Sequence, residues 1–324
     1  GGITGELSAL TAVECIMPEA VAVNSTDHVN RLEKVAGLID NIPDRIAVKS
    51  VVHYRSIYLK DTTQNFSKFM RKSMPKREFL LRVLLLLGLF GQVPAYAACD
   101  DAPAPHVNWA NCDMSGKDFS NQDLSNAVLT KANFDDANFS GALLENTDLN
   151  FASMKNARFD GARMFHTRLV AVKAEGASFK GAELENSRFS RAQLKNSDFT
   201  GIRADNTNFY DADLIGAVLV DARLIKTNFE RTKLTDANFE GATLTESVMS
   251  EAKMHRTRFV AAVMDKVKLD GADCRDADFT EADLSKASFR EAKIEESIFD
   301  KAILKDTTWS NYKRCRASSI GVCK

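Results

Sequence analysis

The sequence has few of the residues and motifs from which an active site is usually recognised. Histidine is scarce, with five in 324 residues and only three after residue 97, at positions 106, 166 and 255. The 16 glycines form neither a phosphate-binding loop nor a dinucleotide fingerprint. No uninterrupted apolar run reaches the roughly 20 residues that a membrane-spanning helix needs. These absences argue against a metal site, a nucleotide site and a membrane span.

What the sequence does contain is an unbroken pentapeptide repeat with 40 centres between Cys112 and Ser310. Every fifth residue from Met114 to Trp309, the centre of its pentapeptide, is Leu or Phe at 29 positions and Met at six. The residue two before each centre is nearly always small, and it is Ala at 23 positions. Helices repeat apolar residues every three or four positions and strands every two, so neither element explains a spacing of five. The repeat predicts a solenoid whose turns bury one face against their neighbours.

A second period of 20 residues lies on top of the period of five. Taking every fourth centre gives a column in which nine of ten residues are Phe, whereas the column from Leu124 to Leu304 contains no Phe. One turn therefore has four sides, and 40 pentapeptides make about ten turns. The predicted structural core is a ladder of stacked rings formed by Phe119, Phe139, Phe159, Phe179, Phe199, Phe239, Phe259, Phe279 and Phe299.

The motif Ala-(Asp/Asn)-(Leu/Phe)-X-X, seen at 132–136, 137–141 and 282–286, resembles the repeat of the pentapeptide-repeat proteins. The resemblance covers about 200 residues, and dozens of copies in one phase make it specific. It implies an all-β fold, a right-handed four-sided parallel β-helix with the centres and their small partners inside. The family motif carries no catalytic residue, so the resemblance implies neither an enzyme nor a cofactor.

Two departures from the repeat are consistent with this packing. The small centres Ala174 and Ala204 follow unusually large partners, Val172 and Ile202, which restores volume in a close-packed interior. Long polar residues occupy the small position only at 117 and 122, in the first turn, where the end of the column can reach water.

A secretory signal peptide is predicted at residues 70–97. A basic stretch at 70–77 precedes the apolar run 79–90 and an Ala-X-Ala ending at Ala97, after which we expect cleavage. The run has about twelve apolar residues with Arg82 inside it, which disfavours a membrane span. Lipoprotein anchoring at Cys99 is a less favoured alternative, because Tyr96 fits a lipobox poorly.

The signal divides the chain into five segments. Residues 1–69 precede it and are not expected in the mature protein, because translation from Met70 or Met74 would place the signal at the N-terminus; a cytosolic domain before a signal anchor is the alternative. The mature part comprises an N-terminal cap at 98–112, the β-helix at 113–310 and a C-terminal cap at 311–324.

The cysteines agree with export. Four of them flank the repeat in two pairs, and oxidising compartments favour the disulfides Cys99–Cys112 and Cys315–Cys323. Zinc is the competing interpretation, but it would need the pairs to meet from opposite ends of the column. Cys274, at a centre, is expected to be a buried hydrophobic residue. The ends are expected to be covered by Trp109 with 99–112, and by Trp309, Tyr312 and 315–323.

The outer surface offers the remaining functional hints. Arginines gather on two neighbouring sides of the middle turns, with Arg163, Arg203 and Arg223 on one side and Arg168 and Arg188 on the next. This group would suit an anionic partner such as lipopolysaccharide, peptidoglycan or an acidic protein. The alternative is a solvated face that Glu183, Glu185 and Asp205 partly neutralise. Small outward contact patches are possible at Val218, Val220, Val260, Leu143, Phe165 and Phe151.

The predicted function is that of a non-catalytic, exported solenoid. It would act in the periplasm or outside the cell as a rigid binding or scaffold module, with an unknown protein or an anionic envelope component as partner and without nucleic acid or cofactor. One alternative is a DNA-mimicking inhibitor of a type II topoisomerase, which requires a cytosolic location. Another is a carbohydrate-acting enzyme, which requires a cleft with clustered outward carboxylates.

Overall fold

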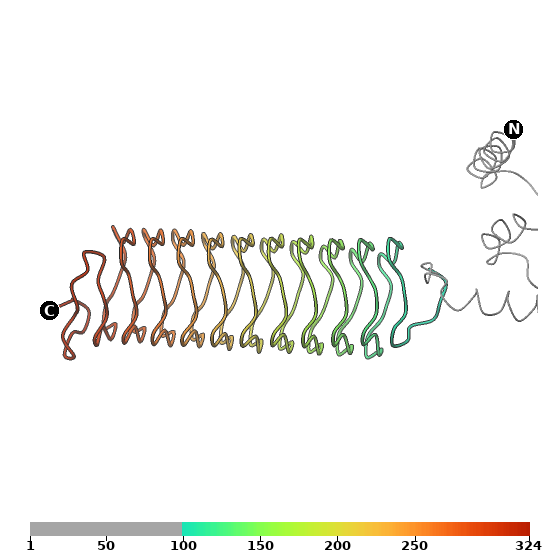
Figure 1. Cartoon of the computed structure of the whole chain (residues 1–324), viewed down its shortest axis with the longest axis horizontal. Coiled ribbons are helices and arrows are strands. Elements are labelled where there is room, and N and C mark those ends of the chain that lie inside the picture. Colours follow the sequence, from blue (N-terminus) through green and yellow to red (C-terminus); the bar gives the residue numbers. More distant parts are fainter. Residues whose placement is uncertain (1–98) are drawn as a thin grey trace, which may run out of the picture. The chain divides into compact units, whose positions relative to one another are not determined.

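A computed structural model describes residues 99–324, which coil into a right-handed four-sided parallel β-helix (Figure 1). Every fifth residue from Asn108 to Ser288 forms a parallel bridge to the residue 20 positions later, so the ladder spans ten turns. Residues 99–324 contain no helix, and each strand is reduced to a single bridged residue. The fold class predicted from the two periods is confirmed.

The four sides are numbered by the centres that they contribute. At intervals of 20 residues, side 1 runs from Met114 to Ile294, side 2 from Phe119 to Phe299, side 3 from Leu124 to Leu304 and side 4 from Leu129 to Trp309. On every side the bridged residue directly precedes the centre, and the two have opposite burial. The centre therefore points into the column and the bridged residue points outward, as alternation along a strand requires.

Each side ends in a tight corner that fixes the spacing of five. The Ala142 N–H donates to the Phe139 carbonyl at 3.0 Å, and Gly141 between them has a φ of +68°. Every fifth residue from His106 to Asp306 has such a positive φ. A turn with positive φ only at its third residue has type II geometry, which Gly and Asn adopt with the least strain. The corner thus explains the glycines and many of the asparagines in the repeat.

Where Asp or Asn precedes the centre, its side chain completes the hydrogen bonding. The amide two residues later faces away from the ladder, and this side chain accepts from it: Asn133 from the Asp135 N–H at 3.1 Å, and Asp283 from the Ser285 N–H at 3.0 Å. Such short-range bonds satisfy donors that secondary structure leaves open. The motif therefore encodes, in order, a small inward residue, an Asp or Asn that accepts a backbone N–H, a large inward residue and a corner.

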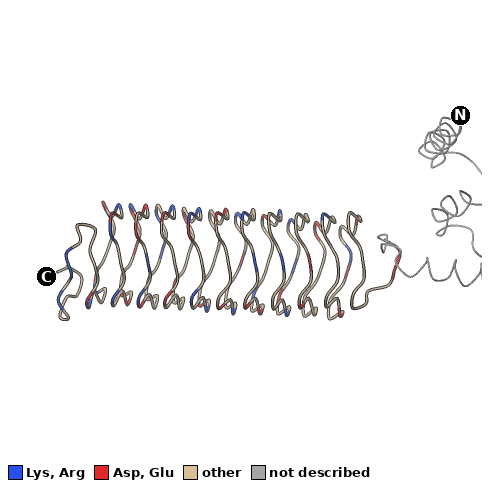
Figure 2. Cartoon of the chain, in the orientation of Figure 1, with Lys and Arg blue, Asp and Glu red and all other residues tan. Residues whose placement is uncertain are grey.

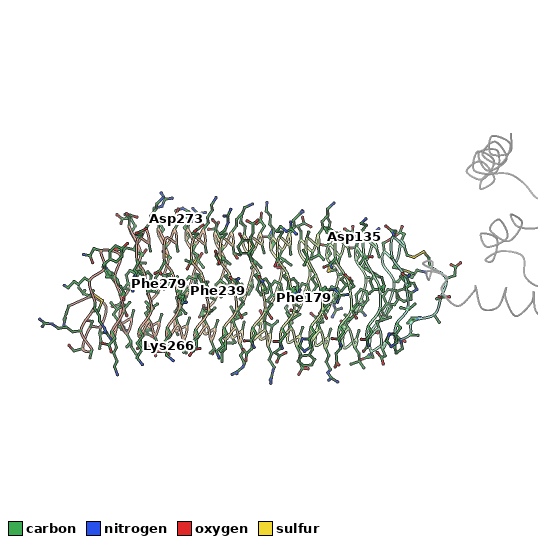
Figure 3. The ribbon with its side chains drawn as sticks, viewed as in Figure 1. Asp135, Phe179, Phe239, Lys266, Asp273 and Phe279 are labelled. Carbon is green, nitrogen blue, oxygen red and sulfur yellow. A yellow bond between two sulfur atoms is a disulfide. The ribbon has the colours of Figure 1, made fainter. Side chains whose placement is uncertain are left out.

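The predicted Phe ladder fills the interior of side 2 (Figure 3). Phe139 and Phe159 stack with centroids 4.9 Å apart and an interplanar angle of 1°, and even Phe299, in the last turn, is only 9% exposed. On side 4, Phe189, Phe209 and Phe229 form a second stack that meets the first edge to face. Both geometries are favourable for aromatic pairs.

The small inward positions on side 4 form a buried column of hydroxyl groups. Several threonines donate to a carbonyl oxygen of the previous turn, as Thr207 does to Leu184 at 2.7 Å, and so remain satisfied without water. Ala174 and Ala204 are fully buried together with their large partners Val172 and Ile202. Cys274 is also buried and free, and its burial raises the pKa of the thiol.

The N-terminal end is closed by a disulfide and a tryptophan. Cys99 is bonded to Cys112, and Trp109 is 1% exposed with its ring 5.1 Å from that of Phe119. The bridge ladder begins at Asn108, inside the segment 98–112 that the sequence assigned to the cap. Lys117 and Gln122 are exposed in the first turn, where the sequence predicted that the end of the column reaches water.

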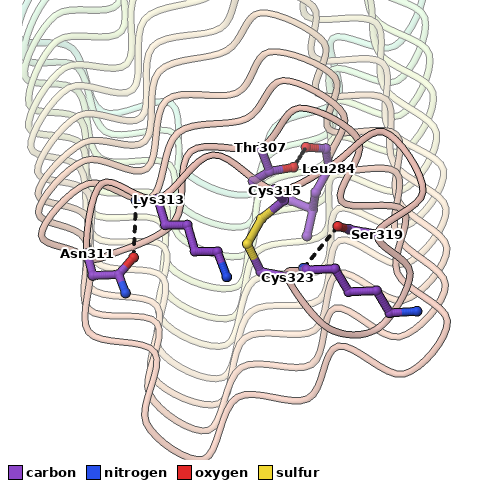
Figure 4. Close-up of a disulfide and its surroundings, with 8 residues drawn as sticks. Leu284, Thr307, Asn311, Lys313, Cys315, Ser319 and Cys323 are labelled. Carbon is purple, nitrogen blue, oxygen red and sulfur yellow. Dashed lines mark hydrogen bonds between the residues drawn. A yellow bond between two sulfur atoms is a disulfide. The ribbon is translucent and has the colours of Figure 1, made fainter.

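The C-terminal end is closed by a strand that turns back (Figure 4). The chain pairs antiparallel with the last turn through Ile303 with Ile320 and Thr308 with Arg314, and a disulfide joins Cys315 to Cys323. Both disulfides link the pairs expected from the sequence.

One expectation about this end was wrong. Tyr312 does not cover the core; it is 59% exposed and donates a hydrogen bond to Glu291 on the outer wall. It follows Trp309 in a turn closed by the Tyr312 N–H, which points the side chain outward. Trp309 itself is only partly buried, although its ring contacts Phe289 and Phe299.

The predicted signal peptide (70–97) and the upstream segment (1–69) lie outside the described residues. Within 99–324 there is no helix with the length and hydropathy needed to cross a bilayer.

Candidate binding surface

The outer wall is built from short ion pairs between neighbouring turns, and positive and negative residues alternate along it (Figure 2). Arg256 lies 2.7 Å from Asp236, and Lys266 lies 3.0 Å from Glu246, each pair being 20 residues apart. The hydrogen bond from Arg256 lowers the pKa of the Asp236 carboxyl group, and the hydrogen bond from Lys266 lowers that of Glu246. Such exposed pairs contribute little to stability, but they cancel charge locally.

The three arginines predicted on side 3 share this arrangement. Each one reaches back 18 residues to a carboxylate near the corner of the previous turn: Arg163 to Glu145 at 2.8 Å, Arg203 to Glu185 at 3.0 Å and Arg223 to Asp205 at 2.9 Å. The hydrogen bond to Glu185 raises the pKa of Arg203 further, so its charge is permanent but compensated. Side 3 therefore presents ion pairs rather than free cations.

Side 4 also has two arginines that are direct neighbours in its ladder, as Arg203 and Arg223 are on side 3, but only one of the two on side 4 has an ion pair within residues 99–324. Arg168 and Arg188 form one bridged pair, and Arg168 donates two hydrogen bonds to a single oxygen of Asp148 at 2.9 and 3.2 Å. Within residues 99–324, Arg188 has no ion pair, and Asn208 follows it in the ladder. Like charges directly opposite each other destabilise a sheet. Arg188 is thus an uncompensated cation beside a second guanidinium.

A shallow depression of about 350 Å³ surrounds these two side chains. The corner between sides 3 and 4 contributes three of its five lining residues, Asn146, His166 and Asn186, all with φ near +60°. Among the described residues, no carboxylate lines the depression. Guanidinium groups and amides are the donors that proteins use to bind carboxylates, phosphates and sulfates. The depression therefore has the composition of a site for an anionic group.

A second depression, of about 410 Å³, provides a contrast. It includes Glu175, Asp211 and Asp213 together with Arg191, Lys195 and Lys233. Asp213 is shared between Lys195 at 3.6 Å and Lys233 at 3.4 Å. Its charges balance, so it lacks the excess of positive charge found around Arg188.

Comparison with known proteins gives the family. The family model described as "Pentapeptide repeat region" matches residues 172–246 and 222–299, and the one described as "Pentapeptide repeats (8 copies)" matches 107–141 and 132–170. The chain belongs to the pentapeptide-repeat family. No curated protein matches it.

Three solved structures are similar to this pentapeptide-repeat protein. HetL, involved in heterocyst differentiation regulation in the cyanobacterium Nostoc sp. strain PCC 7120, is 21% identical, with 71% of this chain and 97% of HetL covered and a TM-score of 0.39. QnrB1, a plasmid-mediated fluoroquinolone resistance protein, is 21% identical over 52% of this chain and 82% of its own, with a TM-score of 0.32. Rfr23 from the cyanobacterium Cyanothece 51142 is 18% identical over 42% and 90%, with a TM-score of 0.15.

The part of this repeat protein that the structure describes has no candidate metal site. Residues 99–324 contain no group of three or more His, Cys, Asp or Glu side chains that could hold a metal ion. His166 lies at the corner between sides 3 and 4, and His255 lies elsewhere with its Nδ1 3.1 Å from Asp276.

Within residues 99–324, most of the large exposed apolar residues lie at the C-terminal end, where the sequence analysis did not predict them. Of the predicted outward patches, only Phe151 is exposed, at 55%; the other five side chains are half-buried in the wall. Instead, large exposed side chains gather in the last turn and the cap: Ile298, Ile303, Ile320 and Val322. The available signal was isoleucine at two successive bridged positions, which are polar in most turns.

Proposed function

We propose that this chain is an exported pentapeptide-repeat protein that acts without catalysis, as a rigid module that binds an anionic partner in the envelope or outside the cell. The observation that carries the proposal is the pairing of Arg168 with Arg188, an uncompensated cation in a depression without carboxylates. The site would take a carboxylate, phosphate or sulfate group of that partner.

Rigidity follows from how the surface is built. Each bridged residue is held by two ladder hydrogen bonds to the turn before it, as Arg188 is through its N–H to the Thr167 carbonyl at 3.0 Å and its carbonyl to the Leu169 N–H at 2.8 Å. The centre beside it, Phe189, is fully buried in the aromatic core. A surface fixed in this way loses little conformational entropy on binding, so a partner can bind more tightly because the backbone does not need to rearrange.

Export is supported by the disulfides and by the predicted signal at 70–97. Local bridges at both ends are typical of oxidising compartments, where they resist reduction. The first test is the intact mass and location of the chain expressed in a Gram-negative host without reducing agent. A periplasmic species that begins at Ala98 and is lighter by four hydrogen atoms is expected; an uncleaved, reduced cytosolic protein would contradict export.

The partner chemistry is tested with purified residues 98–324. Binding to immobilised lipopolysaccharide, peptidoglycan and a sulfated polysaccharide should be measured at low and physiological salt, because an electrostatic interaction weakens as screening increases. We expect Arg188→Gln to weaken binding at least tenfold. The matched control Arg223→Gln, which removes an arginine already paired with Asp205, should change binding less than twofold.

Equal binding by the two variants would remove Arg188 from the proposal, and no binding to any anionic probe would contradict the partner class. A supercoiling assay with a type II topoisomerase tests the alternative. Inhibition by the cytosolic protein would favour mimicry of DNA over an envelope partner.

A further inference from the structure

The C-terminal cap pairs only two of the four sides of the last turn. On side 3 it satisfies the Leu304 N–H and the Ala302 carbonyl, and on side 4 the Trp309 N–H and the Thr307 carbonyl. The cap strand runs antiparallel on both sides, opposite to the parallel direction of every other bridge. The edge of the last turn is therefore able to accept an antiparallel strand.

On sides 1 and 2 the equivalent backbone groups have no partner within residues 99–324. The N–H groups of Ile294 and Phe299 and the carbonyls of Ala292 and Ser297 form no hydrogen bond there. An unpaired edge of this kind readily pairs with another strand unless charge, proline or a covering loop prevents it.

Exposed apolar side chains lie on sides 2 and 3 of the last turn and in the neighbouring cap, whereas charged side chains would be needed to protect the edge from pairing. Ile298, the bridged residue of side 2, is 50% exposed, and Ile303, Ile320 and Val322 are 43%, 60% and 66% exposed. Exposed apolar groups that gather beside an unpaired edge mark an interaction surface.

We propose that two copies of this chain associate tail to tail through side 2, with Ile298 of one copy directly opposite Ile298 of the other. The Phe299 N–H of each copy would donate to the Ser297 carbonyl of the second copy. This is the pattern of a non-hydrogen-bonded antiparallel pair, in which facing side chains lie closest. The molecule contains its template in the pair Ile303–Ile320, where the Leu304 N–H donates to the Ser319 carbonyl and the Gly321 N–H to the Ala302 carbonyl.

A second copy fits the edge because the edge is complementary to itself. A two-fold axis through Ile298 brings one free donor and one free acceptor of each copy together, and it makes the strands antiparallel, as in the cap. Side 1 cannot be used in the same way, since Lys293 would then face Lys293 of the second copy. The cap adds a layer on sides 3 and 4 only, so the two columns would meet at an angle.

Sedimentation velocity and light scattering on residues 98–324 test the proposal over a concentration series from about 1 to 200 μM. We expect a dimer that dissociates on dilution. Ile298→Lys should shift it to the monomer and raise the dissociation constant at least tenfold. The control Val263→Lys places the same charge at an exposed bridged position of side 3, 40% exposed, within the column, and should leave the dimer intact.

Ile298→Cys provides a second readout that does not depend on weak affinity. Because the facing residues of a non-hydrogen-bonded pair are close, this variant should form a disulfide-linked dimer under mild oxidation, whereas Val263→Cys should not. Thermal unfolding of each variant checks that the column remains folded.

A monomeric wild-type protein throughout the series, a dimer that survives Ile298→Lys, or equal cross-linking at both positions would overturn the proposal. Arg188→Gln should leave the dimer unchanged, so failure here and failure of the proposed function are distinguishable.

Discussion

The two ends of the column are closed by similar parts but present opposite chemistry. Each end has one local disulfide and one tryptophan against the aromatic core. The open sides of the first turn carry Asp113, Asp118 and Asp123, whereas those of the last turn carry Lys293 and Ile298. The comparison shows that a solenoid end can be protected either by covering it or by charging it.

The aspartates protect the N-terminal edge in two ways. Their carboxylates accept the N–H groups of Ser115, Ser120 and Ser125 at 3.2, 2.9 and 3.0 Å, and these bonds lower the carboxyl pKa values. The backbone groups of the three aspartates are themselves unpaired within residues 99–324. A strand arriving there would have to approach a row of carboxylates, which disfavours pairing.

The largest difference in stability between the two ends is expected when their tryptophans are replaced. Trp109→Ala should lower the free energy of unfolding by about 3–5 kcal/mol, because it empties a buried site against Phe119. Trp309→Ala should cost clearly less, because that ring is only partly buried. Chemical denaturation of the two variants measures the difference. Trp109→Phe serves as control, because the buried Nε1 has no acceptor within residues 99–324 and this variant therefore loses no hydrogen bond there. Equal losses of unfolding free energy in Trp109→Ala and Trp309→Ala would contradict the view that Trp109 contributes more to stability because it is more deeply buried.

The disulfides should have similar effects on stability but different consequences for association. Loops of 13 and 8 residues correspond to about 3 and 2.5 kcal/mol of stabilisation from chain entropy. Replacing Cys315 and Cys323 by Ala should also release the cap and free two more edges, giving species larger than a dimer. Replacing Cys99 and Cys112 by Ala should not. Denaturation and light scattering of both double variants test this, and an unchanged oligomer after loss of the C-terminal disulfide would contradict it.

Asp118 and Ile298 occupy the same position of side 2 at the two ends, so Asp118→Ile gives the N-terminal edge the apolar side chain of the C-terminal edge. Asp118→Ile removes a carboxylate and the bond to the Ser120 N–H, and places an apolar side chain on an unpaired edge. We expect it to add a second site of self-association, detected as chains of copies by sedimentation. Asp118→Asn, which keeps an acceptor and removes the charge, separates the two roles. If Asp118→Ile stays at the wild-type mass, the carboxylate is not what protects this edge.

Acid should loosen the N-terminal end before the C-terminal one. The folded pKa values of Asp113, Asp118 and Asp123 lie below their ordinary value of about 4, so the folded end binds fewer protons than the unfolded chain. Their stabilising contribution is complete above pH 4 and is lost as the pH falls through the lowered values. Amide exchange should therefore show falling protection at Ser115, Ser120 and Ser125 at low pH, while Leu304 keeps its protection. A simultaneous loss at both ends would contradict this.

The repeat predicted more of the interior than of the surface. A residue and its neighbour 20 positions later always stack, so the ring contacts of Phe139 with Phe159 followed from counting alone. Arg203 instead meets Glu185, 18 positions earlier, through side-chain conformations that the period does not fix. Tyr312 was misplaced because it follows the repeat and its direction is set by a single turn.

The sequence by itself determined the coil, its four sides and its aromatic core. Large apolar residues at spacings of five and 20 can be buried together only if each turn stacks on the last. Only the tertiary structure decided which edges stay open, because the path of residues 310–324 follows no period. Whether Ile298 is covered depends on where that segment crosses the last turn, and it crosses sides 3 and 4.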